Sequence, residues 1–173
     1  MASVIRGSDD FDSGTVGITL GTAVATTSGT SIDFTGIPAG VKRITVMFKG
    51  VSTNSTSNLL VQLGDSGGVE TSSYAGSVTI VTTGVNALNF STGLLLTQQR
   101  TASYSDQGIM TILLMDSATD TWVSSSSVGH VGVAGTQQGS GSKALSATLD
   151  RIRLTTVNGT STFDAGSVNI SWG

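Results

Sequence analysis

The sequence predicts an all-β fold, an antiparallel β-sandwich of jelly-roll-like type, with an extended N-terminal arm. Short segments rich in β-branched residues alternate apolar and polar positions, helix signals are nearly missing, and turn signals recur about every 8–12 residues. The chain has 173 residues, which fits one domain with a substantial hydrophobic core. We expect residues 1–14 to form the arm and residues 15–173 to form a single domain.

The clearest strand is predicted between Lys42 and Val51. Ile44, Val46 and Phe48 alternate there with residues that point to the other face, because successive side chains of a strand lie on opposite sides. The segment Ile37–Gly40 precedes this strand and contains the single proline of the chain, whose fixed φ favours a turn. The pattern therefore indicates a half-buried strand that follows a tight turn.

Two further strands are predicted in the middle of the chain. Asn58–Gly64 shows the same alternation of apolar and other residues. Ile109–Met115 is apolar on both faces, which indicates a central strand covered on two sides, although periodicity alone leaves a short buried helix open. The flanking Gly108 and Asp116 favour the strand.

The C-terminal part predicts two strands joined by a turn. Asp150–Thr156 alternates apolar and charged residues, and Asn158–Gly159 supplies two residues that tolerate a positive φ. The last strand carries Val168, Ile170 and Trp172 on one face. We expect Trp172 to be a core or subunit-interface residue.

Two segments fall outside this pattern, the arm and the Gly/Ser/Gln-rich segment Gly129–Ser142, which we expect to be an exposed loop. Gly64–Tyr74 is a second candidate contact loop. The candidate contact residues of the two loops are Tyr74, His130, Gln137 and Gln138. The candidate docking residues of the arm are Ile5, Arg6, Asp9, Asp10 and Phe11.

Composition limits the kinds of partner. Only 11% of the residues are charged, the net charge is -3 and the isoelectric point is about 4.7, so no basic field exists to hold nucleic acid. No apolar run approaches the roughly 20 residues that span a bilayer, and the N-terminus lacks a signal peptide. We therefore expect synthesis in the cytoplasm, no membrane insertion and no nucleic-acid partner.

The sequence predicts no metal and no other cofactor. Cysteine is absent, which excludes thiolate sites. Asp9, Asp10 and Asp12 could offer oxygen ligands to calcium, but they lack the spacing of an EF-hand loop, so a solvated acidic arm is the preferred interpretation. His130 is the single histidine and cannot build a site without other ligands.

One motif suggests chemistry. Gly64-Asp65-Ser66-Gly67-Gly68 has the same letters as the segment around the nucleophilic serine of trypsin-like proteases. That serine needs a histidine base and an acid, and both precede it in those enzymes. Here His130 lies downstream, so we expect a turn after the strand in which Asp and Ser bond the local backbone, and we predict no enzymatic activity. A serine hydrolase built on Ser66 is a remote alternative.

Several segments resemble virion proteins of tailed bacteriophages, especially tail-fibre-like β-sandwich proteins. The segments that carry the resemblance are Ile32–Val46, Leu149–Thr160, Ile5–Gly14 and Phe163–Ser167. The first two read IDFTGIPAGVKRITV and LDRIRLTTVNGT. They look like structural signatures rather than active-site motifs.

The resemblance implies a β-rich virion component, commonly a homotrimer, that attaches to other virion proteins or adheres to a host-surface receptor. The first hypothesis is a tail-fibre or appendage module for host attachment. The second is a capsid decoration protein that stabilises the head, anchored by the arm from Ala2 to Gly14. Both place the mature protein in the virion.

Overall fold

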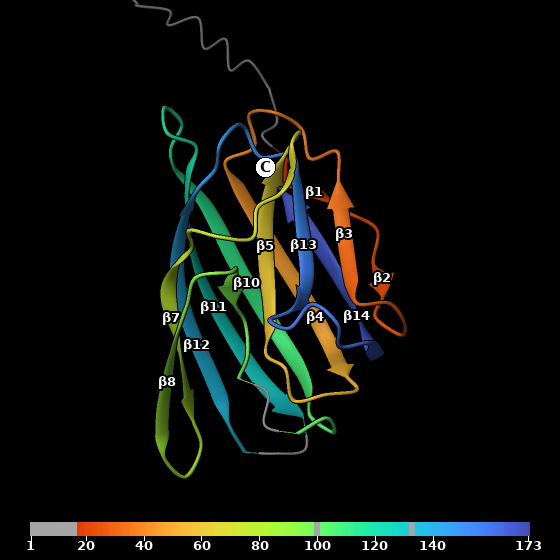
Figure 1. The fold of residues 1–173 in the computed structure, drawn as a ribbon. Helices are drawn as coiled ribbons and strands as arrows, with labels where there is room; N and C mark the ends of the chain where they lie inside the picture. The colour runs from red at the N-terminus through yellow and green to blue at the C-terminus, as the bar shows by residue number, and fades with distance from the viewer. Residues whose placement is uncertain (1–16, 99–100, 132–133) are drawn as a thin grey trace, which may run out of the picture.

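The computed structural model describes residues 17–98, 101–131 and 134–173. Within these ranges fourteen strands form two antiparallel sheets, a large one of nine strands and a small one of five. Figure 1 shows the small sheet in front of the large one, with the hairpin of β7 and β8 extending beyond it. The predicted antiparallel β-sandwich is confirmed.

The large sheet contains, in spatial order, β1 (Thr19–Leu20), β14 (Phe163–Trp172), β4 (Arg43–Thr53), β10 (Ser105–Asp116), β11 (Thr121–Val131), β12 (Thr136–Ala144), β7 (Ala75–Val81) and β8 (Val85–Phe90), and β2 (Val24–Ala25) also pairs with β14. The small sheet contains β3 (Ser31–Thr35), β13 (Arg151–Thr156), β5 (Leu59–Asp65) and β6 (Gly68–Val69), with β9 (Leu94–Leu95) also paired to β5. The order in each sheet brings together strands that are far apart in the sequence.

The core lies between the sheets and follows the predicted alternation. Ile44, Val46 and Phe48 of β4 are buried, as are Ile152 and Leu154 of β13. The inward positions of β14 are also apolar, and Trp172 packs partly buried against the same cluster. The chain has no disulfide, so no covalent cross-link adds to the burial of apolar surface that stabilises this sandwich.

Strand β5 is buried on both faces, which its alternation does not predict. Its other face carries Leu60, which packs with Val78 and Leu95 in a second, smaller cluster, with Leu88 and Phe90 at its margin. The segment that contains β9 and the β7–β8 hairpin therefore covers the side of β5 that would otherwise face solvent.

Two expectations about the middle of the chain are wrong. Gly129–Ser142 is not an exposed loop, because β11 continues to Val131 and β12 begins at Thr136. Ile109–Met115 is a strand, but its second face is uncovered: Ile109 is 50% exposed and Leu113 is 43% exposed. The small sheet covers only one side of the large one, so a strand can be central in the sheet and still present apolar side chains to solvent.

The predicted turns are present. Gly40 in the Ile37–Gly40 segment has a φ of 89°, and Gly159 has a φ of 67°. Residues with a Cβ rarely adopt these values, which explains why glycine occupies both positions.

Candidate interaction surface

The structure buries most of the contact residues predicted from sequence. Tyr74 is 4% exposed, His130 is 8% exposed and Gln137 is fully buried, so these three side chains are not offered to a partner. Gln138 is exposed, and its amide donates to the Ser127 hydroxyl at 2.9 Å. The arm residues Ile5, Arg6, Asp9, Asp10 and Phe11 lie outside the described residues.

His130 belongs to a buried polar network between β10, β11 and β12. Its Nδ1 lies 2.5 Å from Oδ1 of Asp106, and the two side chains are 1% and 0% exposed. Its Nε2 lies 2.9 Å from Nε2 of Gln137. Burial raises the pKa of the Asp106 carboxyl, and the hydrogen bonds from His130 and Thr97 oppose this rise.

The network fixes the position of the imidazole proton. The backbone N–H of Gln98 donates to Oε1 of Gln137 at 2.5 Å, so the amide of Gln137 must direct its NH₂ group at His130. Nε2 of His130 therefore accepts, and Nδ1 carries the proton that faces Asp106. The Tyr104 ring packs against the imidazole at 4.8 Å between centroids. This arrangement serves to satisfy buried polar groups across three strands.

Tyr74 anchors a second polar cluster. Its hydroxyl accepts from the backbone N–H of Leu63 at 2.7 Å and donates to the carbonyl of Glu70 at 2.9 Å. The Lys143 ammonium pairs with the Glu70 carboxylate and lies 5.4 Å from the centroid of the Tyr74 ring. Burial alone would raise the pKa of Glu70, but hydrogen bonds from Lys143 and Ser146 hold it below its ordinary value.

The Gly-Asp-Ser-Gly-Gly motif forms the predicted turn between β5 and β6, and of the two side chains expected to bond the local backbone the structure shows this for Asp65. Oδ1 of Asp65 accepts from the backbone N–H of Gly67 at 2.7 Å, and Oδ2 accepts from the Ser146 hydroxyl at 2.6 Å. These bonds lower the pKa of Asp65. Ser66 is exposed at the end of β5, whereas His130 lies near the end of β11, at the opposite end of the sandwich (Figure 1). The structure therefore does not bring the serine and the histidine together.

The outer face of the large sheet is an accessible surface that extends over several neighbouring strands. Cross-strand pairing places six hydroxyl side chains next to one another, which we call the hydroxyl row: Ser171, Thr45, Thr111, Ser125, Ser140 and Ser77. Neighbouring strands lie about 4.8 Å apart, so the row is roughly 24 Å long. No acidic residue occurs in the row or in the adjacent row that runs from Asn169 to Ala87.

Apolar and basic side chains cross this face along two central strands. Met47 lies directly opposite Ile109, and Arg43 lies opposite Leu113. Lys49 projects from the same face of β4, six positions after Arg43. We call these five residues the β4–β10 strip. Arg43, Met47 and Lys49 are among the residues that the alternation of this strand sets on the face opposite to Ile44, Val46 and Phe48, but nothing in the sequence marked them as site residues.

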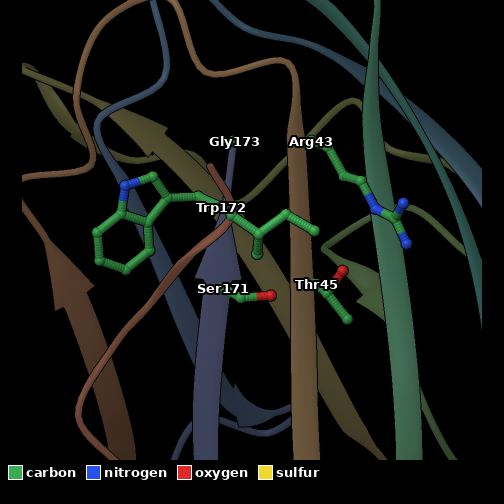
Figure 2. Close-up of a pocket in the computed structure, with 6 residues that line it drawn as sticks. Arg43, Thr45, Ser171, Trp172 and Gly173 are labelled. Atoms are coloured by element: carbon green, nitrogen blue, oxygen red, sulfur yellow. The ribbon is translucent and has the colours of Figure 1, made fainter. Parts of the chain in front are cut away.

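The chain enters the described structure beside this strip. Ile18 lines a cavity of about 10 Å³ together with Arg43, Thr45, Ser171, Trp172 and Gly173, which is space for about one water molecule. Figure 2 shows Thr45 and Ser171 side by side on neighbouring strands, with the Trp172 indole and the Arg43 guanidinium pointing in opposite directions. Ile18 is 67% exposed, so the described part of the chain begins on the outer face.

A polar groove of about 400 Å³ on the small sheet is a weaker candidate. Arg153 lines it but forms two hydrogen bonds with the carboxylate of Asp33, both at 2.7 Å. Gln62 also lines it and donates to the carbonyl of Thr92 at 2.8 Å. Because these donors are already used within the protein, the groove offers a ligand little besides hydroxyl groups.

Comparison with protein-family models, with curated proteins and with solved structures finds no match to this chain. Across the described ranges, no group of three or more His, Cys, Asp or Glu side chains is arranged to hold a metal ion. The same ranges contain no helix with the length and apolar character needed to cross a membrane.

Proposed function

We propose that this protein is a non-enzymatic structural protein of a tailed-phage virion, a tail-fibre or appendage module that takes part in host-surface attachment. The observation that carries the proposal is the outer face of the large sheet, where the hydroxyl row lies beside exposed apolar side chains. A broad face with hydroxyl groups and few charges suits contact with neutral surfaces, because little charge has to be desolvated on binding.

The resemblance to phage virion proteins supports the same proposal through the small sheet. The two segments that carry most of it, Ile32–Val46 and Leu149–Thr160, contain β3 and β13, which pair from Ser31 with Thr155 to Thr35 with Arg151. Segments more than a hundred residues apart in the chain therefore form one structural unit. This arrangement fits the interpretation that the shared residues maintain a scaffold rather than perform a reaction.

A capsid decoration protein is the second candidate, and the exposure of Ile18 favours it. Ile18 is exposed on the outer face, and the arm precedes it in the sequence. An arm joined at the rim of a broad face can reach a neighbouring capsid subunit by adding a strand or covering a groove. In both candidates the mature protein resides in the virion and acts as a homo-oligomer, with a trimer proposed from the resemblance.

Gold-labelled antibodies against this protein, applied to intact virions, test the proposal by electron microscopy. Label at the tail supports the fibre or appendage role, and label over the capsid lattice supports decoration instead. Virions without label at either place would refute both. The remote hydrolase alternative is tested by labelling wild-type protein and the Ser66→Ala variant with a serine-directed probe. A hydrolase built on Ser66 requires that the wild type is labelled and the variant is not.

A further inference from the structure

We propose that the β4–β10 strip is the docking surface for the acidic N-terminal arm, residues 2–14, of a second copy of this chain. The inference rests on the proposed structural role in a virion and adds the surface through which copies associate. A docked arm would cover the part of the hydroxyl row on β4 and β10 and leave the part on β11, β12 and β7 for a receptor. It combines the distribution of unpaired charges, the apolar side chains of the strip, and the direction in which the chain enters the sheet.

The basic side chains of the strip have no carboxylate partner among the described residues. Among the described residues, Lys143, Arg151 and Arg153 each have a carboxylate partner within the chain. No ion pair is formed by the other described basic residues, which are Lys42, Arg43 and Lys49 and which all lie on β4 or just before it.

The arm has the complementary composition. It contains Asp9, Asp10 and Asp12 and a single basic residue, Arg6, which gives a net charge of 1 − 3 = −2. The outward residues of β4, and those of β10 from Ile109 to Met115, include no carboxylate, and Asp116 at the end of β10 already accepts hydrogen bonds from Ala118 and Thr119. Charge complementarity of this kind selects the partner and the register of docking.

The apolar part of the strip also has a counterpart in the arm. Ile109 and Leu113 are 50% and 43% exposed, and Met47 lies directly opposite Ile109. The arm carries Ile5 and Phe11, so it can cover exposed apolar surface while its carboxylates meet the basic side chains at the two ends of the strip. Arg43 and Lys49 are about 20 Å apart along β4, and an extended arm of thirteen residues reaches about 43 Å, so the length suffices.

The direction of the chain favours a second copy over the same molecule. β1 runs antiparallel to β14, with Thr19 opposite Trp172 and Leu20 opposite Ser171. At Gly17 and Ile18, where the described chain begins, it lies beside Gly173, just past the end of β14 at Trp172. A segment that continues in this direction leaves its own sheet, and it would have to reverse to lie on its own strip. Exchange of arms between copies needs no reversal and produces a closed oligomer.

Neutralising the strip tests the contact in the full-length protein. Sedimentation equilibrium of Arg43→Gln/Lys49→Gln should give roughly 2- to 30-fold weaker self-association than wild type, since each exposed ion pair contributes about 0.2–1 kcal/mol. The matched control is Thr71→Glu/Ser72→Glu, which shifts net charge by the same amount at exposed positions away from the strip. The control should associate like wild type. Equal weakening of both variants, or a wild-type protein that stays monomeric at every concentration, would overturn the proposal.

Charge reversal distinguishes a neighbouring copy from the same molecule. The strip variant Arg43→Glu/Lys49→Glu and the arm variant Asp9→Lys/Asp10→Lys/Asp12→Lys should each fail to self-associate, because arm and strip then carry like charges. Their mixture should form a heteromeric complex, because each arm meets a strip of opposite charge on the other variant. A mixture that remains monomeric would overturn docking between copies. Antibody labelling of virions is independent of this result, so failure of the arm contact and failure of the virion role are distinguishable.

Discussion

Replacing His130 with alanine removes the central member of the buried network. The Asp106 carboxyl and the Gln137 amide then lose their shared partner in a region where the Asp106 and His130 side chains are 0% and 1% exposed. Removing one partner of a buried hydrogen bond destabilises a protein by about 1–3 kcal/mol, and by more where the group left behind is charged. We expect a loss of this size in the free energy of unfolding, measured by urea denaturation at pH 7.

Two further variants decide whether the network is the cause. Asp106→Ala/His130→Ala should cost less than the sum of the two single substitutions, because each single change already removes the interaction between these two side chains. Gln138→Ala is the control, since its side chain is exposed on the next residue after Gln137, and it should change stability by less than about 0.5 kcal/mol. A loss for His130→Ala no greater than that for Gln138→Ala would refute the reasoning, as would an NMR spectrum that places the imidazole proton on Nε2.

The remaining predictions concern packing, a buried hydroxyl and pH. Gly108→Ala should destabilise the fold by about 1–3 kcal/mol, because a Cβ there would lie 2.1 Å from the carbonyl oxygen of Ser127, whereas Gly129→Ala, where no atom lies within 4 Å, should be nearly neutral in the same unfolding assay. Tyr74→Phe should cost about 1–3 kcal/mol, since it leaves a buried backbone N–H without its acceptor; a melting temperature equal to wild type would contradict this. The Ser146 hydroxyl lowers the pKa of Asp65 below 3.8, so this bond stabilises the fold above that pH and the benefit is lost as pH falls. The stability difference between wild type and Ser146→Ala should therefore shrink below pH 4, and a difference that grows on acidification would show that the carboxylate is not the acceptor.

The fold class and several strands follow from local pattern. The alternation in Lys42–Val51 and Asp150–Thr156 identifies the buried face of β4 and β13, because one face of each strand meets the core. The turn after β5 was also predictable, since Asp and Gly at Asp65–Gly68 supply a local hydrogen bond and a positive φ.

Strand β12 was not predicted from the sequence, because its residues have a low intrinsic preference for strands. It contains Gly139 and Gly141 between serine and glutamine residues, a composition typical of loops. In the structure these glycines permit close packing: a Cβ at Gly139 would lie 2.7 Å from the Ser126 hydroxyl, and one at Gly141 would lie 2.9 Å from the Ala75 carbonyl oxygen. Pairing with β11 and β7 forms the strand, and those partners are not evident from the segment itself.

The sequence by itself determined that this chain forms alternating strands and tight turns, because side-chain periodicity and turn chemistry are local properties. Only the tertiary structure decided which faces are covered. It buried His130 and Gln137 by pairing β11 with β12, and it left Ile109 exposed because the small sheet covers a single side of the large one. Burial depends on partners brought together from distant parts of the chain, and so the interaction surface became visible only after the sheets were assembled.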